Sequence, residues 1–206
     1  MRHICKTDAP KSLNDFNKEH HTIWKEIHED RNKHVYEDCL TQCELDQKEL
    51  CGYTEIPLSS GKKHIDHYIK RDIDPTLTFS WTNMVAAIKD HRFGADWKDD
   101  HIIKNEDYDS SQKKYKGILN PLVDDMRGRF KFATNGFMEP SNVNDTMAKN
   151  TIKMFNLNDE TLQKRREYNM TAARSMYEGG LSKKEIIAYL ASDGFISAVE
   201  YELSMV

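Results

Sequence analysis

A carboxylate and a histidine, followed by an asparagine and a second histidine, form the part of this chain best suited to chemistry. Asp66 and His67 are adjacent, Asn83 follows, and His91 comes last. A carboxylate can hold a divalent metal ion, and an imidazole can take a proton from water near neutral pH. An amide can hold that imidazole by hydrogen bonding. Hydrolysis of a phosphodiester by metal-activated water needs these groups, and the series therefore predicts a nuclease site.

We predict a separate role for each member of the series. Asp66 is the first protein ligand of a divalent metal ion, and His91 is the second. His67, with an unperturbed pKa of ~6.5, is the general base that deprotonates the attacking water. Asn83 fixes the ring of that histidine or the loop beside it. His64 is a supporting ligand or phosphate contact, because it shares a strand face with Asp66.

Basic side chains lie close to this series in the sequence. Lysine and arginine neutralise phosphate charge and bind phosphate oxygens, so these residues are candidates to hold the backbone of a nucleic acid. The candidates are Lys63, Lys70, Arg71 and Arg92, with Lys62 beside the first of them.

Each of these residues also has a simpler explanation when it is taken alone. A chain with nine histidines contains some closely spaced pairs by chance. Asn83 can cap a helix that follows it, and His91 can be an ordinary surface residue. The nuclease prediction therefore depends on the order of the whole series.

The composition is typical of one soluble domain or of a small catalytic core with additions. The chain has 206 residues, of which 38% are hydrophobic and 31% are charged. No apolar run approaches the roughly 18 residues of a membrane span, and the N-terminus lacks the apolar segment of a signal peptide. Four cysteines are sparse for a secreted disulfide scaffold. We therefore expect a cytoplasmic protein without membrane contact.

The net charge of −4 limits how the chain can bind nucleic acid. Proteins that bind nucleic acid over a large surface are usually basic overall. Either the contact with phosphates is local, or a partner protein supplies the positive surface.

The order of helical and broken segments predicts an α+β fold that is mostly helical. Residues 1–50 form an N-terminal helical region, with helices expected over 12–36 and 37–50. Residues 51–140 form a central region with the Gly and Pro breaks typical of short strands and turns. Residues 141–206 form a C-terminal helical region suited to packing or partner binding.

Local signals predict the elements of the last two regions. In the central region we expect a strand over 63–67, an extended piece over 79–81, a strand or helix over 83–88, a helix near 91–99, and a hairpin over 129–138 that turns at Asn135-Gly136. In the C-terminal region we expect a helix that ends at Gly179-Gly180, a capping box from Ser182 to Glu185 that opens the next, and a last helix from Phe195 to Met205.

The last helices also have the order of a helix-turn-helix, which would make the chain a transcriptional regulator. A DNA-reading helix places basic or amide side chains toward the bases. The segment 195–203 instead carries Glu200 and Glu202 and no Lys or Arg, so it would repel phosphates. We expect it to pack or to bind a partner protein.

Several motifs together give the chain a resemblance to the HNH endonucleases, whose core is a ββα-metal fold. More narrowly, the chain resembles the PtuB family of HNH nucleases from Septu-type and retron-associated anti-phage systems. The similarity spans most of residues 1–170. Its motifs are Gly52-Tyr53, His64-Ile65-Asp66-His67-Tyr68, Trp81-Thr82-Asn83-Met84, Lys98-Asp99, 118–122, Asp124-Asp125, Phe130-Lys131-Phe132, Gly136, Thr151-Ile152, Leu157-Asn158 and Arg165-Arg166.

The resemblance implies a metal-dependent endonuclease that is the toxic effector of a defence complex. The expected partners are a PtuA-like ABC/SMC-type ATPase, a retron reverse transcriptase with its multicopy DNA, and the DNA or RNA that is cleaved. The expected cofactor is a divalent ion, Mg or Mn in the first place and Zn or Ni otherwise. The alternative is a non-catalytic adaptor of the same complex, whose central region only binds nucleic acid or the partner.

The chain departs from that family at its cysteines. Relatives often carry Cys-x-x-Cys pairs that bind a structural zinc, whereas Cys51 is followed three positions later by Thr54. The second pair, expected near 91–94, is absent from the sequence. Cys39 and Cys43 lie upstream without an evident fourth ligand, and a structural zinc uses four. We therefore expect no structural zinc and expect the flanking helices to hold the core.

Overall fold

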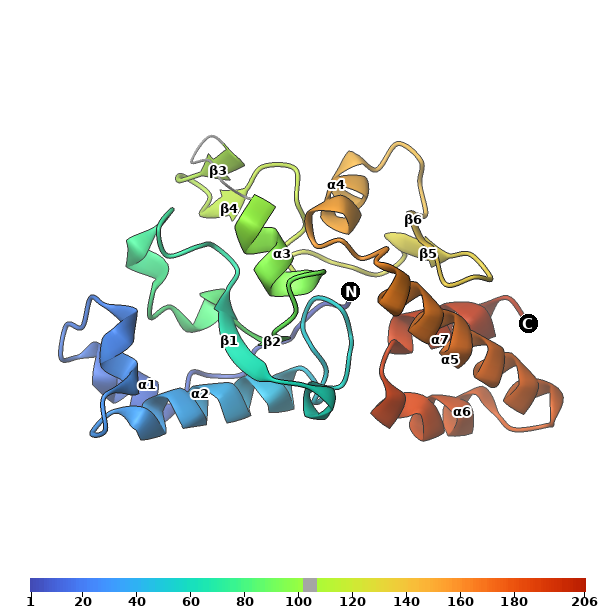
Figure 1. The fold of residues 1–206 in the computed structure, drawn as a ribbon, viewed down its shortest axis with the longest axis horizontal. Helices are drawn as coiled ribbons and strands as arrows, with labels where there is room; N and C mark the ends of the chain where they lie inside the picture. Colours follow the sequence, from blue (N-terminus) through green and yellow to red (C-terminus); the bar gives the residue numbers. More distant parts are fainter. Residues whose placement is uncertain (102–106) are drawn as a thin grey trace.

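The fold is α+β, as predicted, with more helix than strand, and a computed structural model describes residues 1–101 and 107–206 of it. Figure 1 shows α1 and α2 at one end, α5 to α7 at the other, and a small strand pair with α3 between them. In the described residues, no helix has the length and apolar character needed to cross a membrane. The described helices are α1 (Lys11–Asn17), α2 (Lys33–Asp46), α3 (Gly94–His101), α4 (Thr146–Met154), α5 (Glu160–Glu178), α6 (Lys183–Leu190) and α7 (Ile196–Ser204). Three antiparallel pairs join β1 (Lys63–His67) to β2 (Met84–Ile88), β3 (Tyr108–Asp109) to β4 (Lys114–Tyr115), and β5 (Phe130–Phe132) to β6 (Met138–Pro140). Short 3₁₀ turns cover Trp24–His28, Leu58–Ser60, Pro75–Leu77, Trp81–Asn83 and Ala191–Asp193.

β1 and β2 pair in a regular antiparallel register, and α3 packs against β2. Lys63 lies opposite Ile88, and His67 lies opposite Met84. Every residue of β2 is buried, because its run Met-Val-Ala-Ala-Ile offers apolar side chains to both faces of the pair. The predicted strand over 63–67 is confirmed. The segment 83–88, for which the sequence allows a strand or a helix, contains the strand β2.

The segment before β2 is not extended, so the prediction for residues 79–81 is wrong. Trp81–Asn83 form a short 3₁₀ turn that leads into β2. The indole N–H of Trp81 donates to the Thr7 carbonyl at 2.8 Å and ties this turn to the N-terminal segment. A tertiary contact thus overrides the preference of aromatic residues for strands.

The long helix predicted over 12–36 is wrong, because the chain turns after α1. α1 ends at Asn17, and His20 takes a left-handed backbone conformation with a φ of 59°. An L-residue with that φ does not continue a right-handed helix. The next residue, His21, stacks on Phe16 with 3.8 Å between ring centroids, so the turn is held by a side-chain contact.

α2 begins and ends four residues earlier than the helix predicted over 37–50. The residue that follows it, Gln47, uses its side-chain amide as a neighbouring strand would use its backbone. It accepts from the Ala86 N–H and donates to the Ala86 carbonyl, both at 2.8 Å. These bonds cover the free edge of β2 and hold α2 against the central strand pair.

The predicted hairpin with an Asn-Gly turn is confirmed by β5 and β6. Gly136 has a φ of 76°, which glycine adopts without steric cost. A Cβ at this position would collide with the carbonyl oxygen of Gln163 on α5. The Arg166 guanidinium donates to the Gly136 carbonyl at 2.7 Å, so the hairpin and α5 are fixed to each other.

α5, α6 and α7 pack together around a small apolar core. α5 ends at Glu178, before the two glycines, and Ser182 with Glu185 forms the capping box that opens α6, both as predicted. On α7, Glu202 is buried in an ion pair with Arg174 of α5. One of the two glutamates of α7 therefore faces a helix of the same chain. The core of the three helices consists of Ala173, Ile186, Leu190, Val199 and Leu203.

Candidate functional site

β1 ends with two adjacent members of the predicted series, Asp66 and His67, whose side chains point to opposite faces of the strand pair. Asp66 faces α3, and His67 faces the turn at Trp24–His28. Both nevertheless line one cavity of about 150 Å³. The structure therefore brings the carboxylate and the imidazole together while the strand stays regular. The same cavity is lined by Trp24, His64, Lys70, Arg71 and Asp99.

His67 is nearly fully buried, and its hydrogen bond determines which ring nitrogen can act as a base. Nε2 lies 2.8 Å from the Thr78 carbonyl oxygen. Since a carbonyl only accepts, Nε2 carries the proton and Nδ1 keeps its lone pair. The Trp24 ring meets the imidazole edge-on, with 4.5 Å between centroids. Among the described residues nothing else hydrogen-bonds this ring, so Nδ1 is available to accept a proton.

The pKa of His67 favours the neutral ring. Burial lowers this pKa from 6.5 to about 4, and the hydrogen bond to Thr78 offsets only part of the effect. The ring is therefore uncharged near neutral pH, because the buried imidazolium would lose its hydration. An unprotonated ring is the form that a general base must have.

The lowered pKa of His67 predicts that the folded state becomes less stable in acid. His67 binds its proton at about pH 6.5 in the unfolded chain but only at about pH 4 in the folded chain, so the folded state loses stability as the pH falls through that window. We expect the free energy of unfolding to fall by about 2 kcal/mol more in the wild type than in His67→Gln between about pH 7 and about pH 5. Glutamine keeps a donor for Thr78 and does not titrate. Urea unfolding at both pH values measures the difference, and equal changes in the two proteins would contradict a buried neutral His67.

Asn83 holds the loop that leaves β1. Its Oδ1 accepts from the Ile69 N–H at 2.8 Å, and its Nδ2 donates to the Ile69 carbonyl at 3.0 Å and to the Leu77 carbonyl at 3.3 Å. The Asn83 carbonyl accepts from the Tyr68 N–H at 2.9 Å. The amide therefore contacts the loop and not the imidazole. The amide fixes Leu77. The next residue, Thr78, has the carbonyl that orients His67.

Asp66 is held by two buried donors that have no role in the predicted series. Lys98 Nζ donates to Asp66 Oδ2 at 2.7 Å, and the Tyr53 hydroxyl donates to the same oxygen. The side chain of Lys98 has no exposed surface. In the sequence both donors belong to motifs that carry only the family resemblance, Gly52-Tyr53 and Lys98-Asp99. Their distance from Asp66 along the chain is the reason that no local spacing pattern identifies them.

Two polar atoms at the cavity are buried without a hydrogen-bond partner in the described part of the chain. They are Asp99 Oδ1 and His64 Nδ1. Asp99 Oδ1 lies 3.1 Å from Lys98 Nζ. Burial, with the nearby Asp66 carboxylate, raises the pKa of Asp99 to about 6. A buried polar atom without a partner is unusual and suggests an unfilled role.

Two of the predicted phosphate-binding residues lie at the cavity. Lys70 Nζ donates to the Asp99 carbonyl at 2.6 Å, and the Arg71 guanidinium lies over the Trp24 ring, 5.7 Å from its centroid. Both line the cavity. They place positive charge at the cavity.

The other two predicted phosphate-binding residues are engaged elsewhere. Lys63, at the start of β1, pairs with Glu44 at 2.8 Å. Arg92 pairs with Asp90 at 2.7 Å. Neither lines the cavity, so the structure does not bring these two residues to the site.

His91 is not brought to the cavity either. It lies in the loop before α3, its side chain is 81% exposed, and its Nδ1 is 3.7 Å from Asp96 Oδ2. The carboxylate that the structure places beside Asp66 is that of Asp99, since both approach Lys98 Nζ. His91 as second metal ligand therefore stays a prediction.

The donor atoms at the cavity fit a divalent cation in type. Asp66 and Asp99 offer oxygens, and His64 offers a nitrogen, which are ligands that such ions accept. In the parts of the chain that the structure describes, no group of three or more His, Cys, Asp or Glu side chains is arranged so that it could hold a metal ion. Two buried atoms without a hydrogen bond, His64 Nδ1 and Asp99 Oδ1, are the feature that fits an ion here, and the second of them pairs with Lys98.

No protein-family model matches this chain, and no curated protein matches it. The resemblance to HNH nucleases therefore depends on the sequence motifs. In element order, the strand pair of β1 and β2 is followed by α3, and a ββα-metal core stays a prediction.

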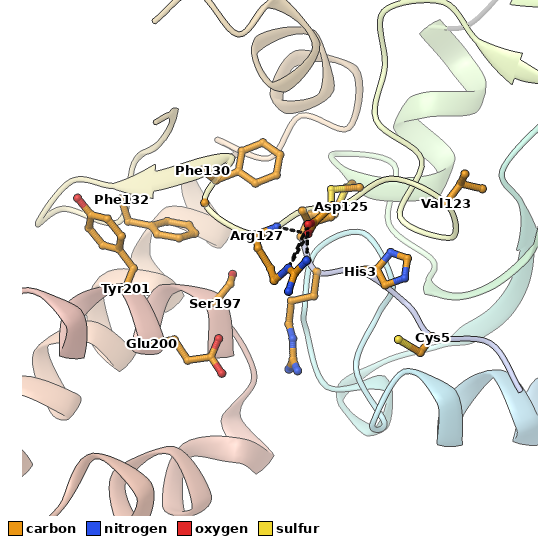
Figure 2. Close-up of a pocket in the computed structure, with 14 residues that line it drawn as sticks. His3, Cys5, Val123, Asp125, Arg127, Phe130, Phe132, Ser197, Glu200 and Tyr201 are labelled. Carbon is orange, nitrogen blue, oxygen red and sulfur yellow. Dashed lines mark hydrogen bonds and ion pairs between the residues drawn. The ribbon is translucent and has the colours of Figure 1, made fainter. Parts of the chain in front are cut away.

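A larger groove of about 810 Å³ lies apart from the predicted series. Figure 2 shows Phe132 and Tyr201 close together on one side of it, and the ion pair of Asp125 with Arg127 near its centre. Its volume and partly apolar lining are those of a ligand site. None of the predicted catalytic, metal-binding or phosphate-binding residues lines it. Of the predicted series, Asp66 and His67 line the smaller cavity instead.

Proposed function

We propose that this chain is a metal-dependent endonuclease of the HNH type that hydrolyses phosphodiester bonds. The observation that carries the proposal is the bond from His67 Nε2 to the Thr78 carbonyl, at 2.8 Å. It leaves Nδ1 as the basic nitrogen at a cavity that the Asp66 carboxylate shares. Support also comes from α3, which brings Asp99 to the same cavity.

The residues at the cavity divide the reaction between them. His67 Nδ1 takes the proton of the attacking water. Lys70 and Arg71 bind the phosphates beside the scissile bond. Asp66 and Asp99 would hold a divalent ion, Mg or Mn, which when bound polarises the phosphoryl oxygen and stabilises the leaving oxygen.

The partners implied by the resemblance are part of the proposal. The net charge of −4 gives the chain little long-range attraction for nucleic acid. A PtuA-like ATPase would then deliver or hold the substrate, and the chain would act as the toxic effector of the complex. Co-purification of the tagged chain with the product of a neighbouring ATPase gene tests this part separately.

One observation favours the alternative, a non-catalytic adaptor. Asp66 Oδ2 already accepts hydrogen bonds from Lys98 and Tyr53. A carboxylate that is satisfied in this way can be purely structural. An adaptor would bind nucleic acid or the partner protein without cleaving, and divalent ions would not change its behaviour.

Removal of divalent ions separates the two functions. We expect the chain, assayed alone and with its co-purified partner, to cleave DNA or RNA in Mn²⁺ or Mg²⁺. EDTA should lower the rate at least about 100-fold, because a Lewis acid contributes several kcal/mol to such a reaction. Adding the ion back should restore the rate. Cleavage that EDTA leaves unchanged would contradict the metal, and no cleavage of any nucleic acid with any ion would favour the adaptor.

A further inference from the structure

Lys98 is a fully buried lysine whose ammonium group bonds the Asp66 carboxylate of the proposed site. Its Nζ donates to Asp66 Oδ2 at 2.7 Å, to the His67 carbonyl at 2.7 Å and to the Tyr68 carbonyl at 3.2 Å. Asp99 Oδ1 lies 3.1 Å from it. A lysine ammonium has three donors, and all three go to acceptors where β1 ends: the Asp66 carboxylate and the carbonyls of His67 and Tyr68.

The atoms around Lys98 Nζ form a cation position made of oxygens. Two belong to the carboxylates of Asp66 and Asp99, and two are backbone carbonyls. Hard divalent ions prefer oxygen ligands of these kinds. One ammonium carries a single positive charge against two carboxylates, so it neutralises them only in part. A divalent ion matches the charge of this position better.

We infer that the Lys98 ammonium is an internal competitor of the divalent ion and occupies the cation position beside Asp66 until an ion displaces it. The inference rests on the proposed function, since it takes Asp66 to be the carboxylate that binds the ion. Two cations cannot share this position, because like charges a few ångströms apart repel strongly where water is excluded. The ion therefore binds more weakly than the two carboxylates alone would allow.

Displacement of Lys98 also links ion binding to the general base. The ammonium holds the carbonyls of His67 and Tyr68, which lie where β1 ends. When Lys98 moves away, these carbonyls lose their donor and the backbone beside the imidazole can adjust. Occupancy by the ion thus changes the surroundings of the base.

The test is a titration with Mn²⁺ alone, without nucleic acid, on Lys98→Met and on the wild type. Methionine has a similar length and suits a buried site, but it carries no charge. We expect the affinity for Mn²⁺, measured by calorimetry, to rise about tenfold or more in the variant. The matched control is Lys63→Met, which removes the same charge at the start of β1, where Lys63 pairs with Glu44. The Mn²⁺ affinity of this variant should change by less than about twofold.

A merely structural role for Lys98 predicts the opposite change in Mn²⁺ affinity, a decrease. If the lysine only held β1 against α3, its loss would disorder Asp66 and weaken Mn²⁺ binding. Lys98→Gln serves as a second variant, because its amide can still donate to the carbonyls without the charge. Far-ultraviolet circular dichroism and urea unfolding identify which variants are folded. An unchanged or weaker Mn²⁺ affinity in a folded variant would overturn the inference.

The wild type offers an independent measurement if neither variant folds. Lys98 should resist acetylation by acetic anhydride without Mn²⁺, because its side chain has no exposed surface. At saturating Mn²⁺ the displaced amine should be acetylated several-fold faster, as read by mass spectrometry of its peptide. Equal protection with and without the bound ion would also overturn the inference.

These outcomes separate the inference from the proposed function. Tighter Mn²⁺ binding by Lys98→Met in a chain that cleaves no nucleic acid would support the competition and refute the nuclease. Metal-dependent cleavage by a chain whose Mn²⁺ affinity does not respond to Lys98 would support the nuclease and refute the competition.

Discussion

The His67→Ala variant is expected to lose nucleic acid cleavage by about 10²–10⁴-fold, the usual contribution of a general base. Among the described residues the His67 ring makes one hydrogen bond, from Nε2 to the Thr78 carbonyl, which leaves Nδ1 as the basic nitrogen. Alanine removes the nitrogen and leaves Asp66 and Asp99 in place. Initial rates at saturating Mn²⁺ measure the loss, and the Mn²⁺ affinity should stay within about threefold of the wild type.

The control for His67→Ala is His101→Ala. His101 is an exposed histidine on α3 that stacks on Trp97 and does not line the cavity. Its loss should leave the cleavage rate within about twofold. Full cleavage by a folded His67→Ala protein would contradict the mechanism. A failure of both variants would point instead to general damage of the fold.

His91→Ala and Asp99→Asn together decide the second metal ligand. The sequence predicts His91, and the structure places the carboxylate of Asp99 beside Asp66. The variant that lowers the Mn²⁺ affinity identifies the ligand. His91 is 81% exposed, so its replacement should not disturb the fold, and a loss of affinity there would confirm the sequence prediction directly.

The elements that the sequence predicts well are those with a local signal. Asn135-Gly136 specifies a tight turn, and Ser182 with Glu185 specifies the start of α6, because each signal acts within a few residues. β1 is predicted from its place between Gly and Pro breaks in the helical pattern. The turn and the start of α6 form from residues a few positions apart, whereas β1 pairs with β2.

The elements that are predicted wrongly depend on distant partners. Residues 12–36 have apolar side chains at helical spacing, but the chain turns at His20, and Trp24 packs against His67 instead of continuing a helix. Gln47, just after α2, replaces a strand at the edge of β2. A pattern read from one segment does not contain such contacts.

The residues of the candidate site also fall into two groups, those found from local order in the sequence and those found only from distant contacts. Asp66, His67 and Asn83 are found from their order along the chain. Lys98 and Asp99 meet Asp66 only through the packing of α3 on the strand pair, at a separation of 32 residues for the Lys98–Asp66 bond. A buried lysine also contradicts the expectation that lysine is exposed, so composition gives no reason to select it.

Asn83→Ala is expected to lower the free energy of unfolding by about 2–4 kcal/mol. Asn83 is 4% exposed, and its loss leaves the Ile69 N–H and the carbonyls of Ile69 and Leu77 without their side-chain partner. Asn14→Ala is the control, since this exposed amide makes a single bond, to the Ala9 carbonyl at 3.2 Å. It should cost less than about 0.5 kcal/mol. Urea unfolding measures both variants.

The cleavage rate of Asn83→Ala then shows how the amide acts. If Asn83 positions the loop that carries Thr78, the imidazole loses its fixed orientation in the variant. We then expect folded Asn83→Ala to cleave about tenfold or more slowly than the wild type. Asn83→Asp should recover part of the stability, because its Oδ1 still accepts from the Ile69 N–H, but it places a carboxylate beside the Ile69 and Leu77 carbonyls. A folded Asn83→Ala protein that cleaves at the wild-type rate would show that the loop orients without it. A loss of rate without a loss of stability would instead place Asn83 in contact with the substrate.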